Sequence, residues 1–338
     1  MRFQLSVLSS QFSVLKKNFQ FSIFNFLFYY LCHSNYNSDI MANVDLHGMG
    51  VALITPFKED ESVDYEALIR MVDFLMANGT DYIVALGTTA ETPCLFEDEK
   101  KEITRIIVER VNGCIPIILG IGDNCTRKTL SQIERTDFKG ISALLSVVPY
   151  YNRPSQEGIY QHYKTIAEAA PLPIVIYNVP GRTGTNMTAT TTIRIAHDFN
   201  NIIAVKEASG NITQISDIIN NKPSGFEVIS GDDGLTFPII ASGGIGVISV
   251  IGNAFPKEFS RMVHLILEND CGKARLIHAH LAEIFDLLFV DGSPAGVKSM
   301  LYLMGLIENK LRLPLVPARN ATFERISDVL NKMNVIAK

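Results

Sequence analysis

Residues 202–206 read Ile-Ile-Ala-Val-Lys, a short continuous apolar run that ends in a lysine. An apolar run without polar alternation is typical of a parallel β-strand that is buried on both faces. Further runs of this kind occur along the chain, at residues 49–55, 82–86, 115–120, 143–148, 174–178, 226–230 and 246–251. The sequence therefore predicts eight buried parallel strands.

The segments between these runs have helical spacing. In residues 62–78, Leu68 and Val72 lie on one apolar stripe, with Ser62 as the predicted N-cap and Gly79 just beyond the end. Helices are also expected at residues 96–111, 126–138, 156–170, 188–196, 258–268, 273–289, 294–306 and 321–333.

Alternating strands and helices predict the α/β class and a (β/α)8 TIM barrel with a C-terminal helical appendage. A doubly wound open sheet is the alternative. No G-x-G-x-x-G motif follows the first run, which counts against a dinucleotide-binding fold of that kind. We expect residues 41–270 to form the catalytic barrel and residues 271–338 to form the helical region.

Residues 1–40 differ in composition from the rest of the chain, because they hold ten of its thirty aromatic residues and only four charges. The apolar stretch 19–32 is too short and too interrupted to predict a membrane span. No small-x-small cleavage site follows it to indicate a signal peptide. Three interpretations stay open: a stretch upstream of a true start at Met41, a targeting or membrane-surface segment, or a structural arm. We expect a non-native or disordered extension.

The composition argues against several classes of protein. The chain has 338 residues, 47% hydrophobic and 19% charged, with a net charge of −5, which is typical of a soluble globular enzyme. Without a basic block, we expect no nucleic-acid partner. The five cysteines form no C-x-x-C and the seven histidines form no H-x-x-x-H, so we expect no metal site and a reduced, cytoplasmic location.

Lys206 is the most informative candidate residue. Reactive groups of a TIM barrel lie at the C-terminal ends of its strands, and Lys206 ends an apolar run. Burial disfavours the ammonium form and lowers the pKa of a lysine, and a neutral amine is the nucleophile that a Schiff base requires. The alternative is a lysine that pairs with a neighbouring carboxylate such as Glu207, or one that extends into water.

Other polar residues follow neighbouring runs. Tyr177 ends the preceding strand and could exchange a proton with a reacting atom, although a buried tyrosine is more often a core ring. Thr88 and Thr89 follow Gly87 in a turn that could hold a carboxylate, or could be an ordinary connection. Arg182 suits bidentate carboxylate binding, or a surface salt bridge. Their convergence on one mouth of the barrel indicates an active site.

Four motifs are similar to those of a known family. They are GTTAET at residues 87–92, PYYNRP at 149–154, YNVPGRT at 177–183 and VKEASG at 205–210. They resemble the dihydrodipicolinate synthase family, also called 4-hydroxy-tetrahydrodipicolinate synthases, within the pyruvate-dependent class I aldolase and N-acetylneuraminate lyase superfamily. The resemblance extends from about Leu46 to the C-terminus, and residues 1–40 have no counterpart.

The resemblance implies a lyase of lysine and diaminopimelate biosynthesis that needs no cofactor. Lys206 would form a Schiff base with pyruvate, and the resulting enamine would attack L-aspartate-4-semialdehyde. The family also implies a homotetramer built as a dimer of dimers.

The resemblance also implies a role for each site residue. The expected proton relay consists of Tyr177, Thr89 and Tyr151, with Tyr151 reaching into the site of the adjoining subunit. Thr88 and Thr89 would hold the pyruvate carboxylate, and Arg182 would take the carboxylate of the semialdehyde. Gly231 and Ile248 would line the pyruvate pocket.

One departure concerns feedback inhibition. Lysine-inhibited members carry histidines and a glutamate at an effector site, where this chain has Glu97, Lys100 and Lys128, while Asn124 and Tyr150 are retained. A lysine in place of the glutamate puts like charges together, so we expect weak or absent inhibition by lysine.

Two rival functions are a sister aldolase, such as an N-acetylneuraminate lyase, and a non-catalytic barrel that only binds a keto acid.

Overall fold

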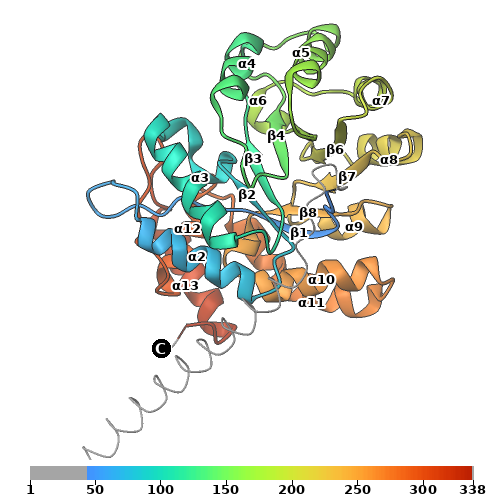
Figure 1. Ribbon diagram of the computed structural model, residues 1–338. Coiled ribbons are helices and arrows are strands. Elements are labelled where there is room, and N and C mark those ends of the chain that lie inside the picture. The colour runs from blue at the N-terminus through green and yellow to red at the C-terminus, as the bar shows by residue number, and fades with distance from the viewer. Residues whose placement is uncertain (1–43, 337–338) are drawn as a thin grey trace, which may run out of the picture. The chain divides into compact units, whose positions relative to one another are not determined.

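The computed structural model describes residues 44–336, and within them eight parallel strands close into a barrel (Figure 1). The (β/α)8 barrel predicted from the sequence is therefore confirmed. Its strands are β1 (Gly48–Ala52), β2 (Tyr82–Ala85), β3 (Ile117–Gly120), β4 (Ala143–Val147), β5 (Ile174–Asn178), β6 (Ile202–Glu207), β7 (Glu227–Ser230) and β8 (Gly246–Ser249). The interpretations of residues 1–40 lie outside the described residues.

Helices lie outside the strands and connect them (Figure 1). They are α2 (Tyr65–Ala77), α3 (Glu97–Val111), α4 (Thr126–Arg135), α5 (Gln156–Ala169), α6 (Pro180–Thr183), α7 (Ala189–Asp198), α8 (Ile212–Asn221), α9 (Thr236–Ala241) and α10 (Pro256–Leu267). Short 3-10 turns are η1 (Thr88–Ala90), η2 (Thr92–Cys94) and η3 (Ile251–Asn253). The sequence analysis did not predict α6, α8 or α9.

The start of α2 differs from the prediction. Asp64, not Ser62, is the N-cap, and its Oδ1 accepts a hydrogen bond from the backbone N–H of Ala67 at 3.0 Å. A bridge between Phe57 and Val63 keeps the chain extended as far as residue 63, so the helix begins later. Gly79 follows the helix with a φ of +82°, as expected of a glycine just beyond a helix end.

Apolar side chains form two separate layers. The outer layer packs between the strands and the helices, and the inner layer fills the barrel. At the N-terminal end of the barrel, the ring of Tyr82 occupies the space that Gly50 leaves free, since a Cβ at residue 50 would lie 2.0 Å from the ring. The barrel is thus a packed core rather than a pore, and polar groups gather at its other end.

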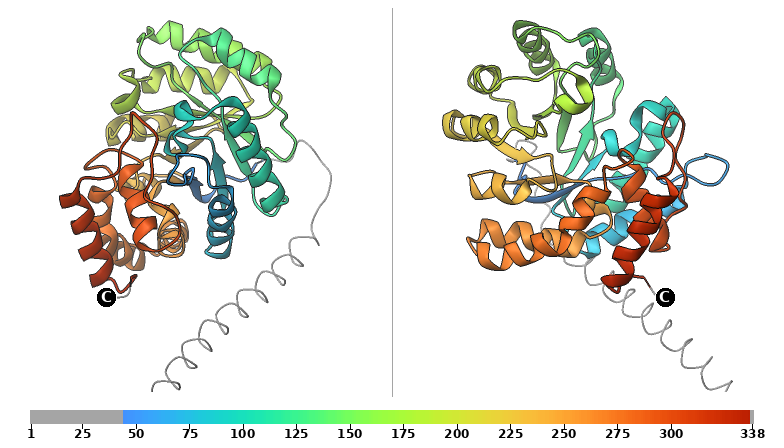
Figure 2. Two further views of the ribbon diagram at one scale, coloured as in Figure 1. Left: turned by 90° about the vertical axis from the view of Figure 1, so that its left-hand side faces the viewer. Right: turned by 180° about the vertical axis from the view of Figure 1, so that it is seen from behind.

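The C-terminal region contains α11 (Cys271–Leu287), α12 (Ala295–Leu303) and α13 (Asn320–Lys332), which confirms the helical appendage. Helix α11 packs against α10, and α12 packs against α13 (Figure 2). Asp270 is the N-cap of α11, and its side chain accepts a hydrogen bond from the backbone N–H of Lys273 at 3.2 Å. Between residues 44 and 336, no helix is both long and apolar enough to cross a membrane.

Candidate active site

Lys206 and Tyr177 lie next to each other at the C-terminal ends of two neighbouring strands. The pairing of β5 with β6 places them directly opposite each other. The Nζ atom of Lys206 lies 4.3 Å from the centroid of the Tyr177 ring. Both side chains are buried, with 5% and 7% of their surface exposed. The register of the barrel therefore brings an amine and a phenol together away from bulk water.

Burial changes the acidity of Lys206. Loss of hydration lowers the pKa of its ammonium group from 10.5 to about 7. The carboxylate of Asp233 opposes this decrease, and the guanidinium of Arg182 adds to it. A large fraction of the side chain is then the neutral amine near neutral pH. This is the state that can attack a carbonyl carbon.

The carboxylate of Glu207 does not neutralise Lys206. Successive residues of a strand point to opposite faces, and Glu207 is held on the outer side of β6. Its carboxylate accepts hydrogen bonds from Asn178 at 2.5 Å, from Gln214 at 3.2 Å and from Ser209 at 2.5 Å. Burial raises the pKa of this carboxyl, and these donors oppose the rise. The structure does not support a simple ion pair between Lys206 and Glu207.

Burial and two neighbouring side chains affect the acidity of Tyr177. Burial raises the pKa of the phenol, while the charge of Arg182 and a hydrogen bond with the Thr88 side chain lower it. Thr88 is exposed at the mouth of the barrel, whereas Thr89 is buried. Thr88 is therefore a further candidate for the relay, in addition to Thr89, which the sequence analysis placed there.

The turn that carries both threonines is tightly held. The carbonyl oxygen of Gly87 accepts the N–H of Ala90 at 3.1 Å and the hydroxyl of Thr92 at 2.8 Å. The hydroxyl of Thr55, from the end of the first predicted strand segment, donates to the carbonyl oxygen of Ala90 at 2.8 Å. Glu91 follows with a φ of +57°. These contacts hold the backbone that carries the two threonines.

Gly231 leaves open the space beside the amine. It follows β7, and its N–H donates to the carbonyl oxygen of Glu207 at 2.7 Å. A Cβ at residue 231 would lie 3.1 Å from Cε of Lys206 and 2.8 Å from Cβ of Ala208. Ile248 on β8 belongs to the apolar layer inside the barrel. Gly231 thus lies beside the Lys206 side chain, and Ile248 lies in the interior of the same barrel.

Asp233 is a site residue to which the sequence analysis gave no role. Its side chain is buried, and its Oδ2 accepts the N–H groups of Val250 and Ile251 at 3.0 and 2.8 Å. Its Oδ1 has no hydrogen-bond partner among the described residues. Burial raises the pKa of this carboxyl to about 6, and its charge acts on Lys206. The only signal in the sequence was its place in Ser-Gly-Asp-Asp after the seventh strand.

Arg182 and Tyr151 lie at the rim of the barrel. Arg182 is exposed on the short helix α6, and its charge lowers the pKa values of both Lys206 and Tyr177. Tyr151 has a φ of +72° and 87% of its surface exposed, and its N–H donates to the carbonyl oxygen of Thr183 at 3.2 Å. Within one chain the ring of Tyr151 points into solvent, so a single chain does not complete the expected relay.

The described part of the chain contains no group of three or more His, Cys, Asp or Glu side chains that could hold a metal ion. The polar groups gathered around Lys206 are instead hydroxyls, one arginine and one buried carboxyl. Such a set can bind an anion and move protons, and the amine can form a covalent bond with a carbonyl compound.

Comparison with known proteins gives one consistent result. The family model described as the dihydrodipicolinate synthetase family matches residues 45–333. A 4-hydroxy-tetrahydrodipicolinate synthase of Parabacteroides distasonis is 67% identical over 295 residues, which are 87% of this chain and 99% of that protein.

Solved structures with this fold agree. Dihydrodipicolinate synthase from Thermotoga maritima is 43% identical with a TM-score of 0.84, over 86% of this chain and 99% of that one. A chloride-inhibited dihydrodipicolinate synthase from Acinetobacter baumannii, solved with pyruvate, is 37% identical with a TM-score of 0.84, over 86% of this chain and 100% of that one. The similarity thus covers both the barrel and the C-terminal helices.

Proposed function

Because the chain belongs to the dihydrodipicolinate synthetase family, we propose that Lys206 is the nucleophile that forms a Schiff base with pyruvate. The chain is a lyase of the class I aldolase type, with the 4-hydroxy-tetrahydrodipicolinate synthase activity of lysine and diaminopimelate biosynthesis. The observation that supports the role of Lys206 most directly is its buried amine, with a pKa of about 7, beside the ring of Tyr177.

The first half of the proposed reaction activates pyruvate. The neutral amine of Lys206 attacks the ketone carbon, and loss of water leaves an imine. Loss of a proton from the pyruvate methyl group then gives an enamine, with the imine nitrogen accepting the electron pair. No cofactor is needed, because the protonated imine stabilises the developing carbanion.

The second half joins the two substrates. The enamine carbon attacks the aldehyde carbon of L-aspartate-4-semialdehyde, and the aldehyde oxygen takes up a proton. The amino group of the semialdehyde portion then attacks the imine carbon. Transimination closes the ring, releases the heterocyclic product and returns Lys206 as a free amine.

These steps need several proton transfers, and we assign them to a relay of hydroxyl groups. The effect of the Thr88 side chain on the pKa of Tyr177 supports Thr88 as a further member of this relay. Thr89 stays in the proposed relay, as the sequence analysis placed it, and is also proposed to hold the pyruvate carboxylate. A phenol with hydroxyl groups nearby would provide a path for a proton between the buried site and the rim.

The third relay residue, Tyr151, is proposed to come from an adjoining subunit. Its exposed ring and its φ of +72° are consistent with a side chain that is held outward toward a partner. Phe96 and Leu313 are also exposed, by 72% and 75%. We propose a homotetramer, a dimer of dimers, which sedimentation analysis of the purified protein would test.

The remaining residues are proposed to select the substrates. Both substrates are anions, and the guanidinium of Arg182 suits the carboxylate of the semialdehyde. Gly231 and Ile248 would line the pyruvate pocket. We also propose that the protein acts in the cytoplasm, without nucleic acid or membrane partners, because its substrates are small metabolites.

A direct assay of partner aldehydes tests the proposed function. The purified protein is incubated with pyruvate and either L-aspartate-4-semialdehyde or N-acetylmannosamine, and pyruvate consumption is followed. We expect rapid consumption with the semialdehyde alone. Faster turnover with the amino sugar would instead identify a sister aldolase, and binding of pyruvate without turnover would identify a non-catalytic barrel.

A further inference from the structure

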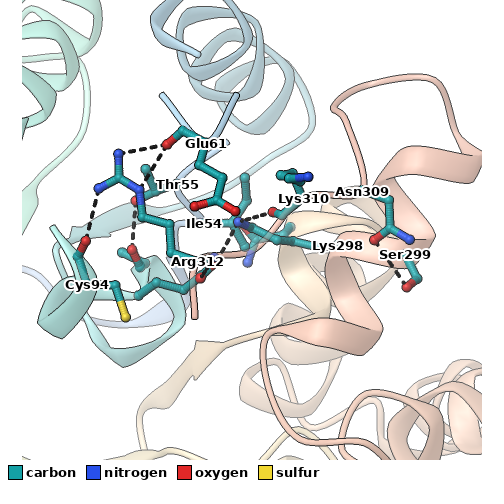
Figure 3. A network of polar contacts seen from close by, with 12 residues as sticks. Ile54, Thr55, Glu61, Cys94, Lys298, Ser299, Asn309, Lys310 and Arg312 are labelled. Carbon is teal, nitrogen blue, oxygen red and sulfur yellow. Dashed lines mark hydrogen bonds and ion pairs between the residues drawn. The ribbon is translucent and has the colours of Figure 1, made fainter. Parts of the chain in front are cut away.

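A fully buried ion pair joins the C-terminal region to the turn that carries Thr88 and Thr89. Lys298 on α12 and Glu91 both have 0% side-chain exposure, and Nζ of Lys298 lies 2.5 Å from Oε1 of Glu91. Nζ also donates to the carbonyl oxygen of Lys310 at 2.9 Å (Figure 3). It lies 4.2 Å from the ring centroid of Phe57. The ammonium group is thus held in place on several sides.

Such a pair is a poor source of stability in itself. Taking both charges out of water costs free energy, which their attraction offsets only with good geometry. Apolar residues of similar size in the same place often give the same or a higher stability. Burial lowers the pKa of Lys298 to about 8, and the carboxylate of Glu91 opposes this fall. What the pair does provide is a fixed position for the Glu91 side chain.

Glu91 is directly connected to the substrate-binding turn. It follows η1, and its N–H donates to the carbonyl oxygen of Thr88 at 3.1 Å. Its φ of +57° is unfavourable for a residue with a side chain, so the surroundings must hold it there. The second carboxylate oxygen, Oε2, accepts the N–H of Arg312 at 3.1 Å. A fixed Glu91 therefore fixes the residue that closes the Thr88 turn.

Arg312 holds the segment that follows. Its guanidinium donates to the carbonyl oxygens of Cys94 at 2.9 Å and of Glu61 at 2.8 Å (Figure 3). It also forms a bidentate pair with the carboxylate of Glu99, with both bonds at 2.6 Å. Its Cζ lies 4.6 Å from the ring centroid of Phe57, the same ring that Lys298 contacts. Through Arg312, the loop between α12 and α13 thus contacts the residues that follow the turn.

We propose that Lys298 and Arg312 are positioning residues, which hold the turn of Thr88 and Thr89 in the geometry that receives the carboxylate of the keto acid. The inference rests on the proposed function, because it takes the turn to be the keto-acid site. Neither residue touches the substrate. Both act through Glu91 and its backbone. Lys298 and Glu91 are 207 positions apart in the sequence.

The variant Lys298→Met tests this inference, because it keeps the length of the side chain and removes its charge. Glu91 is then a buried carboxylate without its partner, and it should move toward water and release the turn. We expect the KM for pyruvate to rise about tenfold or more, a rough scale for a displaced binding group. The pyruvate concentration that half-saturates borohydride trapping on Lys206 should rise by the same factor. The KM for the semialdehyde should stay within about twofold.

A matched control separates positioning from general stability. The variant Ile326→Ala opens a cavity at a fully buried position of α13, in the same region but outside the network. It should lower the melting temperature and leave the KM for pyruvate unchanged. If Lys298→Met fails to fold, Arg312→Gln provides the second test, because it keeps the Lys298–Glu91 pair and removes the contacts to Glu99 and Cys94. It should also raise the KM for pyruvate selectively.

A double variant tests whether Lys298 acts through the turn. In a Thr89→Ala background, where part of the keto-acid site is already lost, Lys298→Met should raise the KM for pyruvate by a smaller factor than in the unaltered protein. Equal factors in both backgrounds would contradict the proposed route. So would folded Lys298→Met and Arg312→Gln variants that keep the KM for pyruvate within twofold while losing thermal stability. If pyruvate does not trap Lys206 even in the unaltered protein, it is the proposed function that fails.

Discussion

Lys206 and Tyr177 are direct partners across β6 and β5, and the Lys206 amine lies 4.3 Å from the centre of the Tyr177 ring. The register of the strands, rather than a loop, sets this relationship. Sites built on strands hold their groups more rigidly than sites on loops. The amine is also buried, so the phenol is one of few groups that can exchange a proton with a reacting atom bound to Lys206.

The variant Tyr177→Phe keeps the ring and removes only the hydroxyl group. We expect kcat to fall about 10²–10⁴-fold, the usual scale for losing a general acid or base, with little change in melting temperature. Steady-state kinetics and calorimetry measure the two effects.

The matched control is Tyr82→Phe, at the other end of the barrel. Tyr82 is also fully buried, and its hydroxyl donates to the carbonyl oxygen of Val247 at 3.2 Å. This change should cost about 1 kcal/mol of stability through the lost hydrogen bond and leave kcat unaltered. If both variants keep normal rates, Tyr177 has no part in the relay.

The pH dependence of the reaction should reveal the buried amine. Lys206 has a pKa of about 7 and reacts only when neutral, so kcat/KM for pyruvate should be constant above about pH 8 and fall below pH 7. Asp233 has a pKa of about 6, so it becomes neutral below pH 6 and no longer raises the pKa of Lys206. The decrease of kcat/KM with falling pH should therefore be less steep below pH 6. Initial rates at low pyruvate concentration between pH 5.5 and 10 measure the profile. A midpoint near 10 would show an ordinary, hydrated lysine.

The variant Gly231→Ala tests the pocket beside Lys206. The new methyl group would lie 3.1 Å from Cε of Lys206 and 2.8 Å from Cβ of Ala208, so the amine must shift. We expect kcat/KM for pyruvate to fall at least about tenfold, since small displacements of reacting groups are costly.

The control for this change is Gly272→Ala. Gly272 lies in the first turn of α11, where the nearest atom to a new Cβ is 3.9 Å away. Alanine should be neutral or slightly stabilising there, with unchanged activity. Normal pyruvate kinetics in the Gly231→Ala protein would remove this residue from the pocket.

Inhibition by lysine should be weak. The family resemblance implies a glutamate at the position of Lys128 in lysine-inhibited members, and Lys100 already pairs with Glu97 at 2.7 Å. Lysine carries an ammonium group that Lys128 would repel. We expect millimolar lysine to change the rate by less than about twofold, and Lys128→Glu to increase inhibition. Strong inhibition of the unaltered protein would show that lysine binds in another way.

The barrel and the place of Lys206 were predictable because both depend on local sequence. Each buried strand is a continuous apolar run, and a polar residue at its end must lie at the barrel mouth. Helix α9 was hard to predict because it has six residues with Pro238 among them, which leaves few apolar repeats from which to detect a helical period. Helix α8 was missed although Ile212, Ile215 and Ile218 have helical spacing and Asn211 caps the first turn.

The finer features of the site depend on contacts between distant parts of the chain. Closure of the barrel brings Asp233, which follows β7, to the backbone N–H groups of Val250 and Ile251, which follow β8. These hydrogen bonds hold the carboxyl whose charge acts on Lys206. Whether Thr88 or Thr89 faces Tyr177 depends on the rotation of a 3-10 turn. The Lys298–Glu91 pair joins residues that no local pattern connects.

Reductive trapping tests the central assignment most directly. The protein is incubated with pyruvate and borohydride, digested, and mapped by mass spectrometry, in parallel with the Lys206→Ala variant. We expect one reduced pyruvyl group on the peptide that contains Lys206, none on the variant, and loss of turnover in the variant. An adduct on a different lysine, or near-normal turnover by Lys206→Ala, would contradict the assignment of Lys206 as the nucleophile.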